Sequence, residues 1–371
     1  MAEALRLARR GLGRTSPNPA VGAVVVRGGR IVGRGFHRRA GGPHAEIFAL
    51  RAAGRRARGA TLYVTLEPCC HTGRTGPCVE RVLAAGVARV VVGSKDPNPR
   101  VRSKGMARLR RGGVAVDCGL LEAECRELNA DFEKFITTGL PFVVLKLAAT
   151  LDGRIAAASG DARWVTGAAA RRRVHEMRNR LDAVIVGSQT VLADDPELTC
   201  RIRGGRDPLR VVLDGRMRTP RSARVFRSHP QRTRLYTLAD RSARARALAR
   251  SGVVVRRGGG DRPGSLRRVL ADLARDGIKS VLIEGGGTLA ARALRDGLVD
   301  RLALFLAPKL LGAEGRPAIG ALGLRRMTQA IALRDVTVER IGDDLLIDAR
   351  PRAAARLAPA GRGAIVSKHP S

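Results

Sequence analysis

The chain has 371 residues, more than one compact core normally contains, and its 44% hydrophobic content is ample for globular folding, so we expect two domains. No apolar run approaches the roughly 20 residues of a membrane span, and the start lacks the apolar segment of a signal peptide, which predicts a cytoplasmic protein without a membrane partner. The formal charge is +36, but only 7 of the 69 basic residues are lysine and the arginines are scattered, whereas a nucleic-acid face would cluster them with aromatic residues.

Short strands and helices alternate along the first part of the chain. We expect strands at 21–26, 30–36, 61–66, 89–92 and 114–116, and helices at 3–11, 44–54, from 78 onward, and at 106–111. The pair Gly28-Gly29 predicts a hairpin between the first two strands. A longer helix at 120–136, with Leu121, Leu128, Phe132 and Phe135 on one face, is predicted to connect this part to the next. The pattern predicts an α/β domain with helices covering a mainly parallel sheet.

A second α/β series begins after Gly139-Leu140-Pro141. Its expected strands are 142–148, 183–186, 209–213, 253–256, 280–283 and 302–306, followed by a hairpin of 331–339 and 343–348 around Gly342. The predicted organisation is a first domain at 1–118, a connecting helix at 119–140, a second domain at 141–350 and a disordered basic tail at 351–371.

The most specific motif combines His44-Ala45-Glu46 with Cys69 and Cys78. One histidine and two thiolates give zinc three protein ligands and leave the fourth position for water, as in catalytic sites. His44 and Cys78 each stand at the start of an expected helix, and helix N-termini stabilise anionic groups such as thiolate and hydroxide. Glu46, two residues after the histidine, is placed to carry protons as the catalytic acid/base. The motif predicts one zinc ion per chain. Disulfides are not expected, and Cys118, Cys125 and Cys200 are interpreted as apolar fillers.

The insert between the two cysteines is longer than the Pro-Cys-x-x-Cys of most zinc deaminases, and it reads Cys70-His71-Thr72-Gly73-Arg74-Thr75-Gly76-Pro77. This motif resembles the bifunctional riboflavin deaminase–reductase family, as do Ser16-Pro17-Asn18-Pro19, Gly35-Phe36-His37 and Asp96-Pro97-Asn98-Pro99. The resemblance implies a cytidine-deaminase-like three-layer domain that removes one ring amine from a diaminopyrimidinone carrying a phosphoribosylamino group. It also implies that the substrate is held by Asn18, His37, His71, Arg74, Asp96 and Asn98. Two residues depart from the family pattern. Phe48 stands where the family often has a histidine, and Ser103 stands where it usually has a glycine.

The second half also resembles that family, and dihydrofolate-reductase-like domains more widely. The matching segments are Pro141 to Val143, Lys146 to Arg154, Trp164 to Thr166, Val186 to Thr199 and Ile283 to Thr288. The last segment carries three glycines between a strand and a helix, where bare backbone can approach a pyrophosphate, although a simple helix-entry turn explains them as well.

The resemblance implies that NADPH reduces the ribosyl ring to an open ribityl chain. The NADPH site would be lined by Ala148, Trp164, Thr190, Asp194, Gly215, Gly286, Gly287, Thr288, Leu289, Ala290, Ala291 and Arg292. The substrate would meet Lys146, Ala162, Arg178, Leu198, Arg201 and Glu284. Lys146 and Asp194 are the candidates nearest the reacting sugar carbon, and Ala162 stands where the family often offers a serine. The resemblance further implies a homo-oligomer.

Two other interpretations share the zinc motif. A polynucleotide deaminase would use the same chemistry and would account for the charge, but not for the long insert or the second half. A basic nucleic-acid-binding protein with structural zinc would need a fourth protein ligand, for which Cys70 is awkwardly adjacent to Cys69. The sequence favours a small phosphorylated pyrimidine over nucleic acid as the partner.

Overall fold

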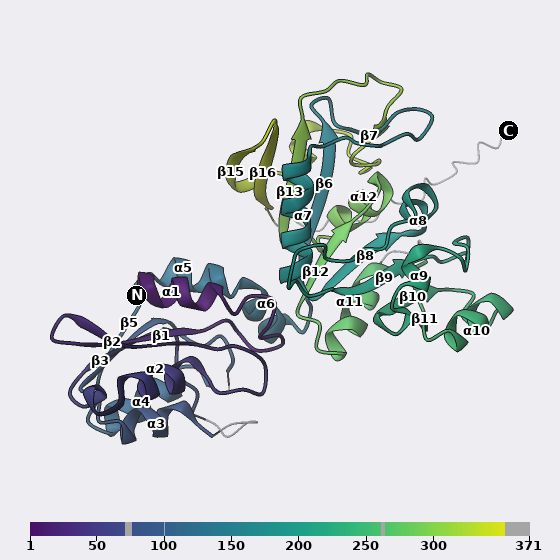
Figure 1. The fold of residues 1–371 in the computed structure, drawn as a ribbon. Helices are drawn as coiled ribbons and strands as arrows, with labels where there is room; N and C mark the ends of the chain where they lie inside the picture. The colour runs from purple at the N-terminus through teal and green to yellow at the C-terminus, as the bar shows by residue number, and fades with distance from the viewer. Residues whose placement is uncertain (71–75, 100, 261–263, 353–371) are drawn as a thin grey trace, which may run out of the picture. The chain divides into compact units, whose positions relative to one another are not determined.

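The computed structural model describes residues 1–70, 76–99, 101–260 and 264–352 (Figure 1). The chain forms two compact units. The first contains Met1–Val144 and Arg171–Glu284, and the second contains Leu145–Ala170 and the chain from Gly285 onward. No helix in the described ranges is both long and apolar enough to cross a membrane.

A five-stranded sheet in the order β2-β1-β3-β4-β5 organises the amino-terminal part of the first unit. Its strands are β1 (Gly22–Arg27), β2 (Arg30–Phe36), β3 (Thr61–Leu66), β4 (Arg89–Ser94) and β5 (Ala115–Cys118). The sheet is mixed rather than mainly parallel. β1 runs antiparallel to both β2 and β3, while β3, β4 and β5 are parallel to one another. The antiparallel pairing of β1 with β2 comes from the predicted hairpin at Gly28 and Gly29, which have positive φ angles of 53° and 73° and reverse the chain between the two strands.

Helices cover both faces of this sheet, which gives the expected three layers. The helices are α1 (Ala2–Arg9), α2 (Ala45–Ala53), η1 (Gly54–Ala57), α3 (Cys78–Ala84), α4 (Lys104–Arg111), α5 (Glu122–Leu128) and α6 (Ala130–Thr138). Alternate residues of β1 enter different cores, because successive strand residues point to opposite faces. Val25 packs in the core that holds Ala49 of α2, whereas Val24 packs with Leu7 of α1.

The predicted single helix at 120–136 is two helices, α5 and α6, which meet at Asn129. Asn129 leaves helical geometry, with φ −116° and ψ 24°. Its side-chain Oδ1 accepts from Ala20 N at 2.8 Å, and its Nδ2 donates to Ala20 O at 3.0 Å. A buried asparagine that binds both backbone groups of a distant residue fixes the break. Sequence periodicity does not reveal such a long-range contact.

The rest of the first unit contains parallel strands in the order β11-β10-β9-β8-β12. These are β8 (Ala183–Gly187), β9 (Leu209–Leu213), β10 (Thr233–Thr237), β11 (Val254–Arg257) and β12 (Ser280–Glu284). The helices are α7 (Ala168–Arg180, which begins in the second unit), α8 (Ser188–Asp194), α9 (Arg224–Arg227), η2 (Pro230–Arg232), α10 (Ala243–Arg250) and α11 (Ser265–Arg275). β10 was not among the expected strands, although its Thr and Tyr residues are typical of strands.

The second unit contains the antiparallel strands β13, β16 and β15 in that order. Its elements are β6 (Phe142–Thr150, which begins in the first unit), β7 (Arg154–Ala156), α12 (Gly287–Arg295), β13 (Arg301–Ala307), β14 (Arg316–Pro317), η3 (Met327–Gln329), β15 (Leu333–Ile341) and β16 (Asp344–Pro351). The expected terminal hairpin is present, and Gly342 turns it with a φ of 62°. Of the tail predicted at 351–371, residues 353–371 lie outside the described residues.

Candidate functional site

Two glycines of β2 bring α2 unusually close to the sheet. A Cβ atom on Gly35 would lie 2.5 Å from the amide nitrogen of Ala49 and 2.7 Å from the Cβ of Phe48, and Gly33 meets the same helix in the same way. Only glycine allows this approach, because any side chain would collide with helix backbone. The close packing fixes the start of α2, where His44 is the N-cap residue and Glu46 lies in the first turn.

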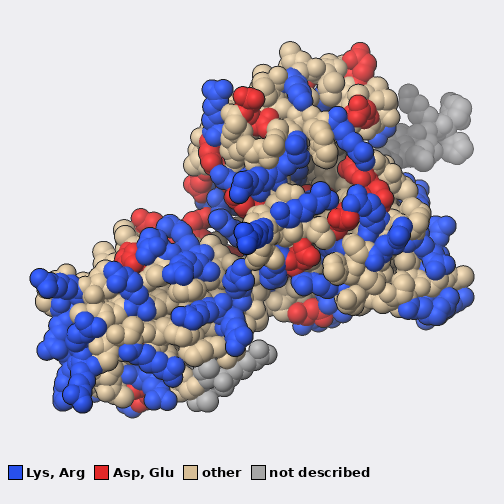
Figure 2. All heavy atoms as spheres, in the orientation of Figure 1, with Lys and Arg blue, Asp and Glu red and all other residues tan. Residues whose placement is uncertain are grey.

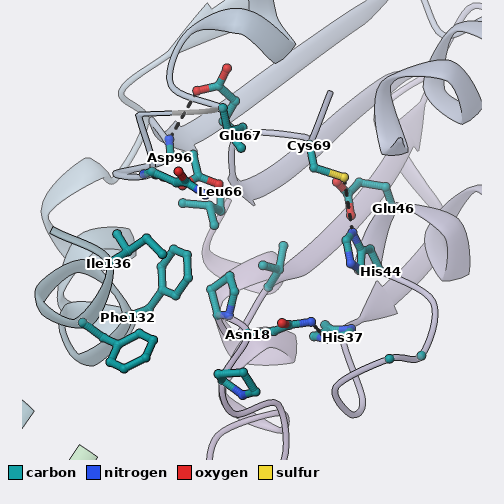
Figure 3. Close-up of a pocket in the computed structure, with 18 residues that line it drawn as sticks. Asn18, His37, His44, Glu46, Leu66, Glu67, Cys69, Asp96, Phe132 and Ile136 are labelled. Carbon is teal, nitrogen blue, oxygen red and sulfur yellow. Dashed lines mark hydrogen bonds between the residues drawn. The ribbon is translucent and has the colours of Figure 1, made fainter. Parts of the chain in front are cut away.

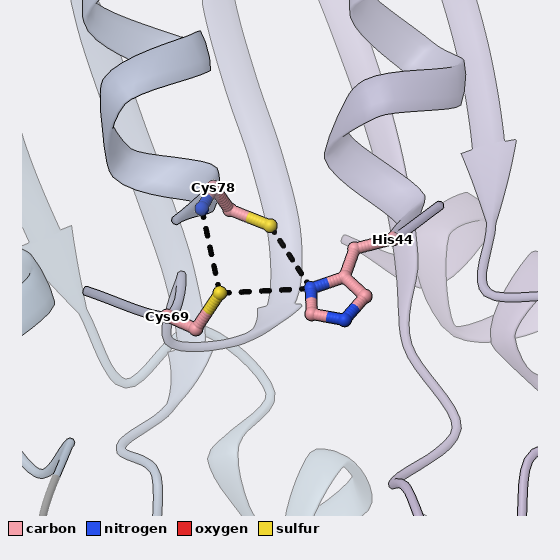
Figure 4. Close-up of side chains that lie close together, drawn as sticks. All are labelled: His44, Cys69 and Cys78. Carbon is pink, nitrogen blue, oxygen red and sulfur yellow. Dashed lines mark hydrogen bonds between the residues drawn. The ribbon is translucent and has the colours of Figure 1, made fainter. Parts of the chain in front are cut away.

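His44, Cys69 and Cys78 form a compact group of ligand atoms (Figure 4). The Nδ1 atom of His44 lies 3.0 Å from Cys78 Sγ and 3.6 Å from Cys69 Sγ, and all ligand atoms lie within 4.8 Å of one another. Tetrahedral zinc, with Zn–S bonds of about 2.3 Å and Zn–N bonds of about 2.0 Å, places sulfur and nitrogen ligands roughly 3.5 Å apart. The group therefore has the donor types and the spacing of a zinc site, with Nδ1 as the nitrogen ligand.

The two thiols are too close to ionise together without a cation between them. A hydrogen bond from Cys78 is the main cause that lowers the pKa of Cys69 to about 4. That same contact, together with burial, raises the pKa of Cys78. A divalent cation would offset the repulsion and let both sulfurs bind as thiolates. The electrostatics of the pair thus fit a bound metal ion.

Glu46 lies beside this group but is not part of it. The residue is 3% exposed, and its Oε2 has no hydrogen-bond partner in the described part of the chain. Burial raises the pKa of its carboxyl group, and the nearby His44 opposes this shift. An unpaired buried carboxylate oxygen is costly unless a ligand or water completes it. Glu46 therefore has the position and the free atom of a proton carrier, rather than those of a metal ligand.

A cavity of about 400 Å³ opens next to Glu46 (Figure 3). The predicted substrate residues Asn18, His37, Asp96 and Asn98 all line it. The other lining residues are Pro17, Pro19, Val21, Gly41, Gly42, His44, Glu46, Leu66, Glu67, Cys69, Val101, Phe132, Phe135 and Ile136. The structure thus brings the zinc motif and four of the six expected deaminase substrate residues to one cavity. The other two, His71 and Arg74, lie outside the described residues.

His37 is held between two polar neighbours at the cavity wall. Its Nδ1 lies 3.1 Å from Pro43 O, and its Nε2 lies 3.2 Å from the Nδ2 atom of Asn18. Burial is the main cause that lowers the pKa of His37, so the ring is neutral near pH 7. A carbonyl oxygen only accepts hydrogen bonds, so Nδ1 carries the proton and Nε2 accepts from the asparagine amide.

Glu67 is a buried carboxylate that was not among the expected site residues. Its two oxygens accept hydrogen bonds from the backbone amides of Asp96, Ser103, Gly105 and Met106, at 2.9–3.2 Å. This arrangement joins the end of β3 to the loop that carries Asp96 and to the start of α4. Ser103 has a left-handed φ of 63°, which explains why the resembling family favours glycine there. The short string Glu-Pro-Cys carries no signal for these contacts.

The apolar face of α6 forms one wall of the cavity, with Phe132, Phe135 and Ile136. In Figure 3 the labelled Phe132 and Ile136 lie on the side of the cavity away from His44 and Cys69. The sequence placed aromatic residues on one face of a connecting helix but assigned them no role in binding. Their position gives a planar ring an apolar surface to pack against.

Among the expected reductase residues of the first unit, Arg178 and Glu284 contact each other. Arg178 Nε and Nη2 donate to the two Glu284 oxygens at 2.6 and 2.8 Å, and both side chains are largely buried. Burial is the largest single influence on the pKa of Arg178 and lowers it, but the charge and the hydrogen bonds of Glu284, with smaller contributions from other groups, together raise the pKa. The remaining residues are Thr190 and exposed Asp194 on α8, Gly215 after β9, buried Leu198 and exposed Arg201.

The expected reductase residues of the second unit lie on several elements. Lys146 and Ala148 are on β6, and Ala162 precedes Trp164, whose side chain is 65% exposed. Gly286 is the N-cap residue of α12, and no heavy atom lies within 4 Å of where its Cβ would be. Gly287 and Thr288 begin the helix, Leu289, Ala290 and Ala291 are buried, and Arg292 is partly exposed. A helix N-terminus with open space at its cap suits an anionic phosphate.

Two protein-family models match the chain. The model described as the RibD C-terminal domain matches residues 141–347, and the cytidine and deoxycytidylate deaminase zinc-binding region matches residues 1–94. The riboflavin biosynthesis protein RibD of Aquifex aeolicus is 43% identical, covering 93% of this chain and 95% of that protein. The RibD protein of Escherichia coli is 41% identical, and the match covers 94% of this chain and 97% of that protein.

Solved structures agree with these matches. The structure of RibD from Acinetobacter baumannii has a TM-score of 0.87 and 41% identity, covering 95% of this chain and 97% of that chain. A Thermotoga maritima protein, titled a diaminohydroxyphosphoribosylaminopyrimidine deaminase and 5-amino-6-(5-phosphoribosylamino)uracil reductase, has a TM-score of 0.85 and 39% identity with the same coverage. This chain therefore belongs to the RibD family of riboflavin biosynthesis proteins, and it joins a zinc-binding deaminase domain to a reductase domain.

Proposed function

We propose that the chain first deaminates 2,5-diamino-6-(5-phosphoribosylamino)pyrimidin-4-one and then reduces its ribosyl group to ribityl with NADPH. The observation that carries the first step is the free Oε2 of Glu46, a buried residue that lines the same cavity as the candidate zinc ligands His44 and Cys69. The name of the Thermotoga relative, which covers nearly the same length, supports both steps.

In the deaminase, His44, Cys69 and Cys78 would hold a zinc ion, which would supply an activated water as the nucleophile at neutral pH. Glu46 takes a proton from the water and delivers it to the departing amine. Water and the ring C–NH2 group are thereby converted into a ring carbonyl and ammonia. Asn18, His37, Asp96 and Asn98 orient the ring and its ribose phosphate, together with His71 and Arg74.

In the reductase, NADPH would supply the hydride, and solvent a proton, for conversion of the ribosyl ring to the open ribityl chain. The start of α12, from Gly286 to Thr288, would hold a phosphate of the cofactor through its backbone amides. The exposed ring of Trp164 offers a surface for stacking. The other residues assigned to NADPH are Ala148, Thr190, Asp194, Gly215 and Leu289 to Arg292. The paired Arg178 and Glu284 meet the substrate with Lys146, Ala162, Leu198 and Arg201.

The domain boundaries follow the same division of chemistry. We assign the deaminase to 1–118, the connecting segment to 119–140 and the reductase to 141–350, in keeping with the ranges of the two family models.

The chain is proposed to act in the cytoplasm as a homo-oligomer. β15 is the last strand in the order β13-β16-β15, and all but one of its residues are exposed, among them Val336 and Val338. An edge strand with exposed apolar side chains offers a surface for pairing with another chain.

A polynucleotide deaminase is the less favoured candidate. Figure 2 shows basic side chains spread over the visible face, with acidic side chains among them, rather than gathered in one patch. The RibD relatives match along nearly the whole chain, including the reductase part, which that candidate leaves unexplained.

The deaminase assignment is tested by ammonia release from the diaminopyrimidine ribotide. We expect release by the zinc-loaded protein, loss after chelation, and recovery when zinc is restored. Release that is unaffected by complete removal of zinc would overturn the assignment.

A further inference from the structure

Lys279, the residue before β12, has a buried side chain whose ammonium group lies next to the deaminase cavity. The side chain is 6% exposed, and its Nζ donates to Asn18 O at 3.0 Å and lies 3.1 Å from Asp131 Oδ2. A buried ammonium group requires such partners, because leaving water without them is costly. All three residues belong to the first compact unit, although Lys279 comes from the part of the sequence that matches the reductase model.

The segment that carries Asn18 is held at three points. Ser16 Oγ donates to Asp182 Oδ2 at 2.8 Å, and Ala20 is bound through both backbone groups by Asn129. Asp182 Oδ2 also accepts from the backbone amide of Lys279 at 3.1 Å. Between Ser16 and Ala20, the hydrogen bond from Lys279 Nζ holds the carbonyl group of Asn18. The backbone of this cavity residue is therefore set by a residue more than two hundred positions away in the sequence.

The orientation of the Asn18 side chain follows from its other contact. Its Nδ2 donates to His37 Nε2, because His37 Nδ1 must donate to the carbonyl of Pro43. The remaining atom, Oδ1, is an acceptor on a residue that lines the cavity. A carboxamide oxygen in this position matches a donor such as an amino group or a ring N–H of a pyrimidine.

We propose that Lys279 is a positioning residue of the deaminase. It holds the main chain of Asn18 so that Oδ1 faces an N–H donor of the pyrimidine, and the reductase part of the sequence thereby completes the deaminase cavity. This inference rests on the proposed deaminase function. It predicts an effect on substrate binding rather than on proton transfer, because Lys279 touches neither the zinc ligands nor Glu46.

The test uses the full chain with Lys279→Met, which keeps the length of the side chain but removes its donors. We expect the KM for deamination to rise about tenfold, the scale of one lost polar contact, while kcat changes little. Zinc content and the reduction of the deaminated ribotide should stay at wild-type levels. Lys279→Arg, which keeps charge and donors, should recover most of the KM. As a separate readout, Lys279→Met in a Glu46→Gln background should bind the diaminopyrimidine ribotide more weakly by a similar factor in calorimetry.

Two further variants separate positioning from general damage. Asp131→Asn removes the ion pair but keeps the donor to Asn18, so its KM should remain near that of the wild type. Arg256→Met is the matched control, because it removes the basic partner of another aspartate, Asp272. Neither Arg256 nor Asp272 lines the cavity, so this variant should deaminate at the wild-type rate. If Lys279→Met does not fold, Lys279→Met/Asp131→Leu, which also removes the stranded carboxylate, is measured against the same expectation.

An unchanged KM in a folded Lys279→Met protein would overturn the proposal, as would an equal loss of both activities. A wild-type protein that fails to deaminate the ribotide would instead refute the proposed function on which the inference rests.

Discussion

The backbone amide of Cys78 donates a hydrogen bond to the sulfur of Cys69, with 3.4 Å between nitrogen and sulfur. The first residue of α3, itself a candidate zinc ligand, therefore supports the other cysteine of the group. Helix amide groups stabilise a thiolate, and charge-assisted hydrogen bonds are stronger than neutral ones. This hydrogen bond thus joins the two cysteines across the insert that separates them in the sequence.

Replacement of Cys78 should abolish the zinc site. Cys78→Ser removes one of three protein ligands, so the purified variant should contain little or no zinc and should not deaminate. Cys70→Ser is the matched control, because Cys70 is adjacent to Cys69 but is not in the ligand group. Metal analysis decides the matter: undiminished zinc in Cys78→Ser, or zinc loss in Cys70→Ser, contradicts the assignment.

Glu46→Gln separates metal binding from proton transfer. The substitution keeps the shape of the side chain but removes its basicity, so zinc should remain while the rate of ammonia release falls by about 10²-fold or more. Glu80→Gln is the control, since Glu80 is an exposed glutamate of α3. Near-normal ammonia release by Glu46→Gln would mean that another group moves the proton.

The close packing of α2 on β2 predicts a large effect for a single methyl group. Gly35→Ala places a Cβ against the backbone of α2, which must shift, and we expect a loss of about 1–3 kcal/mol in the free energy of unfolding. Gly76→Ala is the control, because no heavy atom lies within 4 Å of its Cβ position. Denaturant unfolding followed by circular dichroism measures both. Equal midpoints for Gly35→Ala and the wild type would be incompatible with this packing.

The buried pair of Arg178 and Glu284 makes a prediction for the reductase. Arg178→Met leaves a buried carboxylate without its partner, which should cost about 3–5 kcal/mol of stability and abolish NADPH oxidation. The double variant Arg178→Met/Glu284→Gln should recover most of the stability but not the reduction. Recovery of NADPH oxidation in the double variant would show that the pair has no role in the reaction.

The open space at the N-terminus of α12 allows a test of cofactor binding without damage to the fold. Gly286→Val should be accommodated, because nothing lies within 4 Å of its Cβ, yet its side chain would obstruct an approaching phosphate. We expect normal stability and ammonia release but little NADPH oxidation. Gly287→Val is the contrasting variant: its Cβ would lie 2.6 Å from Pro317 O, so it should lose stability as well. Normal NADPH kinetics in Gly286→Val would refute the cofactor site.

Local sequence patterns predicted most of the elements and the three residues, His44, Cys69 and Cys78, that the structure brings together. The positions of His44 and Cys78 at helix starts, the hairpin at Gly28 and Gly29 and the terminal hairpin at Gly342 each depend on neighbouring residues. The features that were missed depend on contacts between distant residues. The break at Asn129 requires Ala20, and the binding of backbone amides by Glu67 requires the loop after β4. β1 and β3 pair antiparallel because of the chain path, which alternating hydrophobicity does not encode.

The central claim is that one chain performs deamination and then reduction at separate sites. The direct measurement mixes the purified protein with the diaminopyrimidine ribotide and NADPH and follows ammonia and NADPH together. We predict that ammonia appears first and that NADPH is then consumed. Glu46→Gln should oxidise NADPH only when it is given the already deaminated ribotide. Ammonia release by the wild type without any consumption of NADPH on the deaminated product would contradict the account and reduce the protein to a deaminase alone.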